Sequence, residues 1–212
     1  MKFTGLVSLF AILGPALASP TPLNARDLDT IKSVLSDIQK QVNSLNTAIT
    51  AKPLEANPVI TQSNNLVNTI NKGSSTVNAQ GELSQLDALG LVSPTQDLAD
   101  DTDKTVKSLI SIKPDVIKLG EGCTTLTALN KQHKAATGLS SAIVSKVPEA
   151  LGSTAKELSD KISASIQKGA DAYKGSCDQK EEEPKTEESS AEQETAGADA
   201  DVQAKPAACA AN

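Results

Sequence analysis

The residues that could support catalysis begin with a single histidine, His133. A neutral histidine can act as a general base toward a serine hydroxyl, so a serine hydrolase is one class to consider. However, no serine lies in a G-x-S-x-G turn, and His133 follows Leu126 and Leu129 at the spacing of one helix face. The pattern favours a histidine at the surface or edge of a helix, and we expect no enzyme activity.

Four aspartates offer a second candidate chemistry, because Asp97, Asp100, Asp101 and Asp103 could supply oxygen ligands to calcium. They lie near the start of a predicted helix, where carboxylates interact favourably with the helix dipole without any metal. No two cysteines have the close spacing of a zinc site, and no glycine-rich loop could cradle a phosphate. We therefore expect neither a metal nor a cofactor.

Three cysteines, Cys123, Cys177 and Cys209, need pairing or an explanation in an exported chain. Cys123 lies 25 residues before Pro148 and Cys177 lies 29 residues after it, so an antiparallel hairpin that turns at Pro148 returns both to the same end. We predict a Cys123–Cys177 disulfide, which would close a loop of about 55 residues and stabilise the fold by about 4 kcal/mol. Pairing of either residue with Cys209 is the alternative.

The elements that must position these residues are helices. Apolar side chains recur every three or four positions from Leu28 to Ile49 and from Leu151 to Tyr173, which is the period of an amphipathic helix. No alternating run predicts a strand. The sequence therefore predicts an all-α fold, an antiparallel bundle of about five helices. The expected helices are 27–51, one from Asn57-Pro58, one from Ser93-Pro94, 123–147 and one after Pro148, with a short turn or helix at 83–89.

Residues 1–18 are predicted to be an export signal, because Lys2 precedes an apolar stretch and residues 16–18 (ALA) form a small-x-small cleavage site. Residues 19–26 are either a propeptide removed after Arg26 or an ordinary linker. No later segment approaches the roughly 20 apolar residues that cross a bilayer. We expect a secreted protein, extracellular or in a cell wall, with one helical domain over residues 27–177.

Residues 178–212 contain ten acidic residues, three lysines and no aromatic residue. A segment of this composition cannot bury enough apolar surface to offset the entropy of ordering it. We predict a disordered acidic C-terminal tail. It would serve either as a solubilising spacer or as a contact for cations and basic partners.

Tyr173 is the only aromatic residue after the predicted signal, and the whole chain has a formal net charge of −6. A protein with a single aromatic side chain lacks the set of groups that stack on successive bases, and its negative charge disfavours contact with phosphates. Nucleic acid is therefore not an expected partner. The core must consist of Leu, Ile, Val and Ala.

The order of these features resembles a known family. The Arg26-Asp27 junction and the first striped helix are followed by the segments 109–120 (LISIKPDVIKLG), 145–151 (SKVPEAL) and 170–173 (ADAY). Together they resemble the fungal hydrophobic surface-binding protein A family, which includes cell-wall galactomannoproteins. The resemblance covers about residues 27–174.

The resemblance implies a noncatalytic secreted helical protein. It would adsorb to hydrophobic surfaces, could recruit a secreted esterase, and could hold long-chain fatty acids between its helices. The alternative is a structural, O-glycosylated cell-wall mannoprotein without a ligand of its own. An aliphatic interior suits alkyl chains, because each buried methylene contributes about 0.8 kcal/mol. The candidate ligand-binding residues, chosen from the middle of each stripe, are Leu35, Ile38, Val42, Leu66, Ile70, Leu109, Ile143, Leu158 and Ile162.

Overall fold

The computed structural model describes residues 23–177. The predicted export signal and the predicted acidic tail fall on residues 1–22 and 178–212, which lie outside the described residues. Residues 23–26, the last part of the predicted propeptide or linker, form the first turn of a helix.

Five long helices and two short ones make up residues 23–177, and this part of the chain contains no strand. The predicted all-α fold with about five helices is therefore confirmed. The long helices are α1 (Leu23–Thr50), α2 (Ala56–Asn78), α4 (Val92–Ser111), α6 (Gly122–Val144) and α7 (Glu149–Ala172); the short ones are α3 (Gln85–Leu89) and α5 (Lys113–Lys118).

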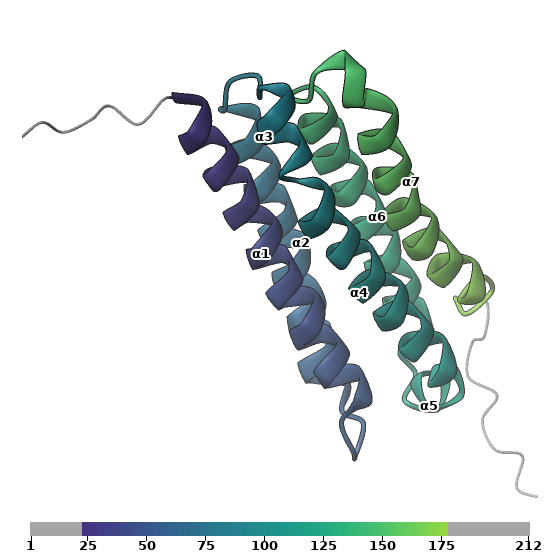
Figure 1. The fold of residues 1–212 in the computed structure, drawn as a ribbon. Coiled ribbons are helices and arrows are strands. Elements are labelled where there is room, and N and C mark those ends of the chain that lie inside the picture. The colour runs from purple at the N-terminus through teal and green to yellow at the C-terminus, as the bar shows by residue number, and fades with distance from the viewer. Residues whose placement is uncertain (1–22, 178–212) are drawn as a thin grey trace, which may run out of the picture. The chain divides into compact units, whose positions relative to one another are not determined.

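The five long helices form a closed ring. Each packs against two others, in the order α1, α2, α6, α7, α4 and back to α1. Long helices that follow one another in the sequence run in opposite directions along the bundle. The short helix α3 lies at one end of the bundle and α5 at the other (Figure 1). Because the stripe of every helix faces inward, the ring has an aliphatic interior with no helix at its centre.

Two helices begin earlier than their proline signals predict. The helix expected from Asn57-Pro58 starts at Ala56, and the one expected from Ser93-Pro94 starts at Val92. Neither the asparagine nor the serine is the capping residue. Proline is tolerated here because the first-turn amide groups have no helical acceptor. The earlier start of α4 places Val92 against the interior.

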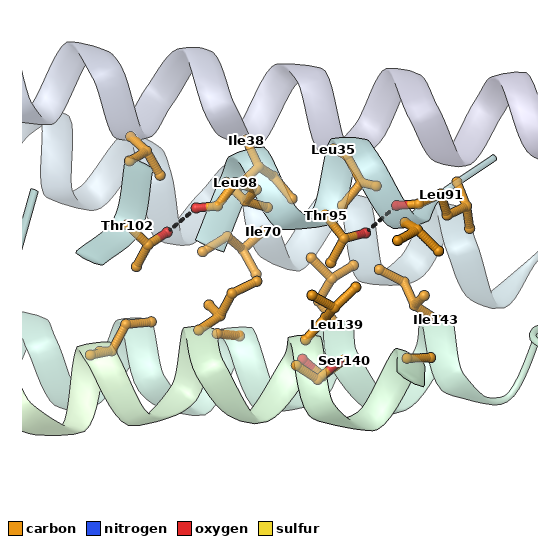
Figure 2. A pocket seen from close by; sticks show the side chains of 18 of the residues that line it. Leu35, Ile38, Ile70, Leu91, Thr95, Leu98, Thr102, Leu139, Ser140 and Ile143 are labelled. Atoms are coloured by element: carbon orange, nitrogen blue, oxygen red, sulfur yellow. Dashed lines mark hydrogen bonds between the residues drawn. The ribbon is translucent and has the colours of Figure 1, made fainter. Parts of the chain in front are cut away.

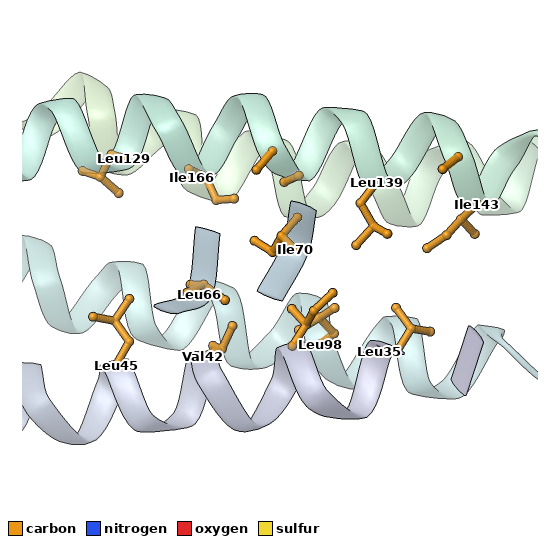
Figure 3. Close-up of a cluster of buried hydrophobic side chains, with 14 of the residues drawn as sticks. Leu35, Val42, Leu45, Leu66, Ile70, Leu98, Leu129, Leu139, Ile143 and Ile166 are labelled. Carbon is orange, nitrogen blue, oxygen red and sulfur yellow. The ribbon is translucent and has the colours of Figure 1, made fainter. Parts of the chain in front are cut away.

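The core is aliphatic along the whole bundle (Figure 3). The helix stripes predicted from the sequence supply its most deeply buried residues, including Ile31 and Ile49 of α1. Tyr173 is the exception in residue type, because this aromatic side chain is wholly buried just after α7.

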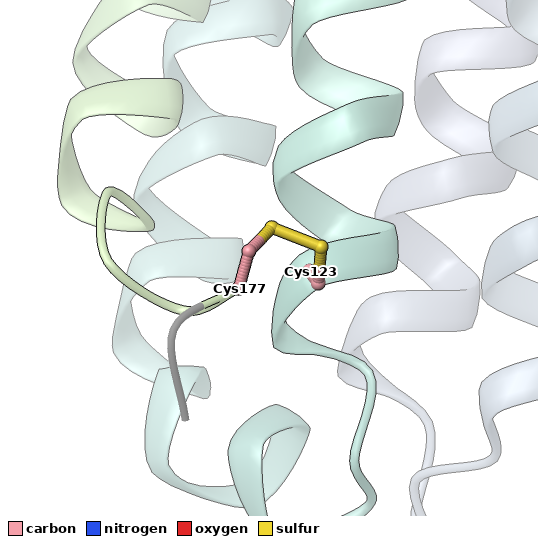
Figure 4. The surroundings of a disulfide bond; sticks show 2 residues. All are labelled: Cys123 and Cys177. Carbon is pink, nitrogen blue, oxygen red and sulfur yellow. A yellow bond between two sulfur atoms is a disulfide. The ribbon is translucent and has the colours of Figure 1, made fainter. Parts of the chain in front are cut away.

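The two ends of the bundle are closed differently. A disulfide joins Cys123 at the start of α6 to Cys177 beyond α7, as predicted (Figure 4). At the opposite end, next to Pro148, the Leu83 amide donates a 2.8 Å hydrogen bond to the Lys146 carbonyl oxygen. This bond links the loop before α3 to the loop between α6 and α7. One end is therefore held covalently and the other noncovalently.

Candidate functional site

A central cavity runs inside the ring and is lined by residues from all five long helices (Figure 2). The space measures about 1020 Å³ when its openings to solvent are included. Only about 80 Å³ of it admits the centre of a water-sized sphere. The cavity is therefore long and narrow. No charged side chain lines it, and its walls are predominantly aliphatic.

Eight of the nine candidate ligand-binding residues line this cavity. The exception is Leu109, which faces a second cavity nearer the disulfide. The arrangement brings the middle of every stripe to one space, although a binding role for each residue stays a prediction. The eight are Leu35, Ile38, Val42, Leu66, Ile70, Ile143, Leu158 and Ile162.

Three threonines of α4 also line the central cavity, and each satisfies its hydroxyl within its own helix. Thr95 donates to the Leu91 carbonyl oxygen at 2.7 Å, and Thr102 donates to the Leu98 carbonyl oxygen at 2.8 Å (Figure 2). Thr105 does the same with Asp101. These threonines present methyl groups as well as satisfied oxygens, so the wall stays mainly apolar.

Two serines of the cavity wall differ from the threonines. Ser140 of α6 and Ser159 of α7 line the same cavity, and neither hydroxyl has a hydrogen-bond partner among the described residues. Ser159 is buried, and Ser140 lies beside the space near Leu139 (Figure 2). A hydroxyl without a protein acceptor in an apolar wall can donate to an oxygen of a ligand.

A second cavity lies toward the disulfide end, between α1, α2, α4 and α6. It measures about 420 Å³ for water-sized spheres, and Cys123 is among its lining residues. Its apolar wall includes Ile49, Leu109 and Leu129, and Lys131 is the only charged residue that lines it. The structure therefore contains two apolar spaces along one bundle.

A polar pair lies where the two cavities meet. Gln132 of α6 lines both cavities, and its side-chain amide donates a 2.9 Å hydrogen bond to the hydroxyl oxygen of Ser63 on α2. Both side chains are buried. Because buried polar groups need hydrogen-bond partners, this bond allows both side chains to lie in an aliphatic interior.

The residues considered for catalysis and for calcium lie elsewhere. His133 is half-buried and lines neither cavity. Asp101 accepts hydrogen bonds from Gln39 and Asn43 of α1, and Asp103 pairs with Lys107. Within residues 23–177, no group of three or more His, Cys, Asp or Glu side chains could hold a metal ion. Asp101 thus links α4 to α1, and Asp103 forms an ion pair within α4.

Sequence reasoning named none of the polar residues of the cavities as candidate ligand-binding residues. Thr95 and Thr102 are seven residues apart within the α4 stripe, a spacing that places both on the inner face. Gln132 is likewise three residues from Leu129 and four from Ala136. Ser140 lies four residues after Ala136 and three before Ile143, and the same spacing holds for Ser159 between Ala155 and Ile162.

Comparison of the sequence with known proteins identifies a family that this chain matches. Residues 28–145 match the sequence profile of the family described as hydrophobic surface binding protein A. The chain is also 40% identical over 175 residues to cell wall mannoprotein 1 of Aspergillus fumigatus, covering 82% of this chain and 61% of that protein. The chain therefore spans less than two thirds of that relative.

Solved structures agree with this assignment. Ligand binding domain 1 of the Penicillium marneffei MP1 protein, complexed with arachidonic acids, is 34% identical with a TM-score of 0.68, and the match covers 70% of this chain and 99% of that one. Ligand binding domain 2, complexed with multiple arachidonic acids, is 32% identical with a TM-score of 0.67, covering 69% and 96%. No helix within residues 23–177 is long and apolar enough to cross a membrane. The chain belongs to the hydrophobic surface binding protein A family.

Proposed function

We propose that this chain is a secreted, noncatalytic cell-wall protein that binds a long-chain fatty acid in its central cavity. The observation that carries the proposal is the closed ring of five helices around a narrow aliphatic space. A narrow apolar space suits an alkyl chain, and each methylene that leaves water contributes about 0.8 kcal/mol. Relatives solved with arachidonic acids share this fold.

The acid group of the ligand would be held by Ser140 and Ser159. Both hydroxyls line the cavity without a protein partner, on the adjacent helices α6 and α7. A carboxylate accepts hydrogen bonds from hydroxyl groups, and these bonds offset part of the cost of removing the charge from water. The threonines of α4 are less suited, because their hydroxyls already donate to α4 carbonyl oxygens.

The ligand would enter at the Pro148 end. Only about 80 Å³ of the central cavity admits water-sized spheres, so the helices must separate to accept an alkyl chain. Separation is hardest where Cys123 and Cys177 are joined. It is easier at the Pro148 end, where the links are noncovalent: the hydrogen bond from Leu83 to Lys146 and the packing of α3 against α1 and α7. An alkyl chain would therefore enter tail first, with its acid group nearer the opening.

Adsorption to hydrophobic surfaces is a second candidate function, favoured by two leucines on α3. Leu86 and Leu89 have relative exposures of 79% and 50% on this short helix, and Ala88 of the same helix lines the cavity. Depletion of the protein by hydrophobic beads should fall in a Leu86→Ser, Leu89→Ser variant. Equal depletion of both proteins would contradict a role for α3. Recruitment of an esterase stays a prediction.

The proposed fatty-acid binding is tested on the secreted chain after removal of lipid. Native mass spectrometry with palmitic acid should show a retained complex, and palmitic acid should raise the melting temperature. A mass spectrum that shows only ligand-free protein, together with an unchanged melting temperature, would contradict the proposal. They would favour the alternative of a structural mannoprotein, which glycan mass in the same spectrum would support.

A further inference from the structure

We propose that the hydrogen bond between Gln132 and Ser63 is a partition that sets how long an alkyl chain the protein prefers. Chains that reach the partition fill the central cavity, and longer chains must displace it and continue into the second cavity. This inference rests on the proposed fatty-acid binding. It identifies Gln132 and Ser63 as specificity-determining residues.

The two cavities adjoin and share part of their walls. Leu45, Thr105 and Val106 line both spaces, as Gln132 does. Ser63 lines only the second cavity, on the α2 side. The Gln132 amide reaches across to the Ser63 hydroxyl oxygen at 2.9 Å, so this polar link crosses the junction.

The second cavity can accept the end of an alkyl chain. It offers about 420 Å³, compared with about 80 Å³ in the central cavity on the same measure. Its inner wall is aliphatic at Ile49, Leu109 and Leu129. No acidic residue lines it. The space beyond the partition is thus already open, whereas the space before it must widen.

The position of the partition defines a length. Gln132 precedes Ser140 by eight residues on α6, which corresponds to about 12 Å along the helix axis. A ligand that entered tail first from the Pro148 end, with its acid group at Ser140 and Ser159, would extend toward the disulfide end. Its tail would meet Gln132 after about this distance.

The energetic balance predicts a threshold. Loss of a buried hydrogen bond costs about two- to tenfold in affinity, and each buried methylene gains about fourfold. At the tenfold end of that cost, one extra methylene does not repay opening of the partition, whereas about two do. Affinity should rise with chain length, level off at the partition, and rise again for longer acids.

The test measures dissociation constants for decanoic, lauric, myristic, palmitic, stearic and arachidic acids with the full secreted chain. Wild-type protein should show the levelling within this series. In Gln132→Ala and Ser63→Ala the partition is absent, so affinity should rise without levelling. The longest acids should then bind about tenfold more tightly than to wild type. Gln39→Ala is the matched control, because Gln39 donates to Asp101 between α1 and α4 and lines no cavity.

A second measurement locates the tail directly. In amide NMR spectra of wild-type protein, arachidic acid should shift resonances of Thr124 and Ala128, which line only the second cavity. Decanoic acid, which would end near Gln132, should leave them in place. This readout also decides the question if Gln132→Ala does not fold.

The outcomes separate the two proposals. If wild type and both partition variants show the same chain-length series, or if arachidic acid leaves the second cavity unshifted, the partition inference is overturned and fatty-acid binding stands. If wild type binds none of the acids, both are overturned. A change in the series for Gln39→Ala equal to that for Gln132→Ala would also overturn the role of the partition.

Discussion

The Tyr173 hydroxyl donates a 2.9 Å hydrogen bond to the backbone carbonyl oxygen of Leu109. This contact joins the end of α7 to the last turns of α4, and the tyrosine ring is wholly buried. The Lys113 ammonium lies 5.7 Å from the ring centroid and donates to the Ala172 carbonyl oxygen at 2.6 Å. Tyr173 therefore fastens two helices that are neighbours in the ring but distant in sequence.

This burial makes stability sensitive to alkaline pH. Removal from water raises the pKa of Tyr173 from 10.0 to about 12. The folded protein thus keeps the phenol proton after the unfolded chain has lost it. The resulting stability is complete below about pH 10 and should be lost by about 2 kcal/mol as the pH rises toward 12.

Urea unfolding at several alkaline pH values measures this loss. Tyr173→Phe is the control, because it removes the titrating group and leaves the lysines in place. The variant should be about 1 kcal/mol less stable at neutral pH, where the hydrogen bond is missing. Its stability should then fall less steeply above about pH 10. Parallel curves for the two proteins would contradict the assignment.

The Cys123–Cys177 disulfide should contribute strongly to stability. It joins residues separated by 54 positions, and replacing both by Ser frees a long loop in the unfolded chain. We expect a loss of about 4 kcal/mol in chemical unfolding, with helix content by circular dichroism retained. Retention of palmitic acid should weaken, because the bundle can then part at both ends. An unchanged unfolding midpoint would show that the bond constrains little.

Ser140 and Ser159 should determine the affinity for the acid group. Replacing each by Ala should weaken palmitic acid binding by about 1–2 kcal/mol, as measured by calorimetry. Palmityl alcohol, which carries no charge, should lose less. Thr102→Val is the matched control, because it removes a hydroxyl that already donates to the Leu98 carbonyl oxygen. Similar losses in the control and the serine variants would argue against their assigned role.

Filling the central cavity should block binding without unfolding the protein. Ala136 is buried and lines the cavity, so Ala136→Leu adds an isopropyl group in the open space. Palmitic acid affinity should fall at least about tenfold while the melting temperature is kept. Ala135, equally buried but outside both cavity walls, provides the comparison. There the same change should overpack the core and cost about 1–3 kcal/mol. Undiminished binding by Ala136→Leu would place the ligand elsewhere.

The helices and the disulfide could be predicted because their signals are local or follow from the chain reversal at Pro148. The unbroken stripe from Leu28 to Ile49 demands burial on one face only, and α1 follows it. Similar distances from Pro148, 25 and 29 residues, were enough to bring Cys123 and Cys177 together. Closure of the ring required more, since the contact of α1 with α4 depends on packing among all five helices.

The orientation of α6 about its axis could not be derived, because the apolar stripe of this helix is weak. The inner face of α6 is rich in alanine, which occurs both in cores and on surfaces. The sequence therefore does not define which face of this helix points inward. At about 100° per residue, both Gln132 and His133 fall near Leu129 and Ala136. Packing against α2 places Gln132 inside and leaves His133 at the edge.

A ring with no helix at its centre also has a consequence for the lifetime of the proposed secreted protein. A ligand in the cavity would add apolar contacts to the core of the folded state only. Ligand binding and folding would therefore be thermodynamically linked. At a free ligand concentration of about 100 times the dissociation constant, the folded state gains about 2.7 kcal/mol. Protein that carries lipid would therefore resist extracellular proteases longer than empty protein, and its lifetime would report the local supply of lipid.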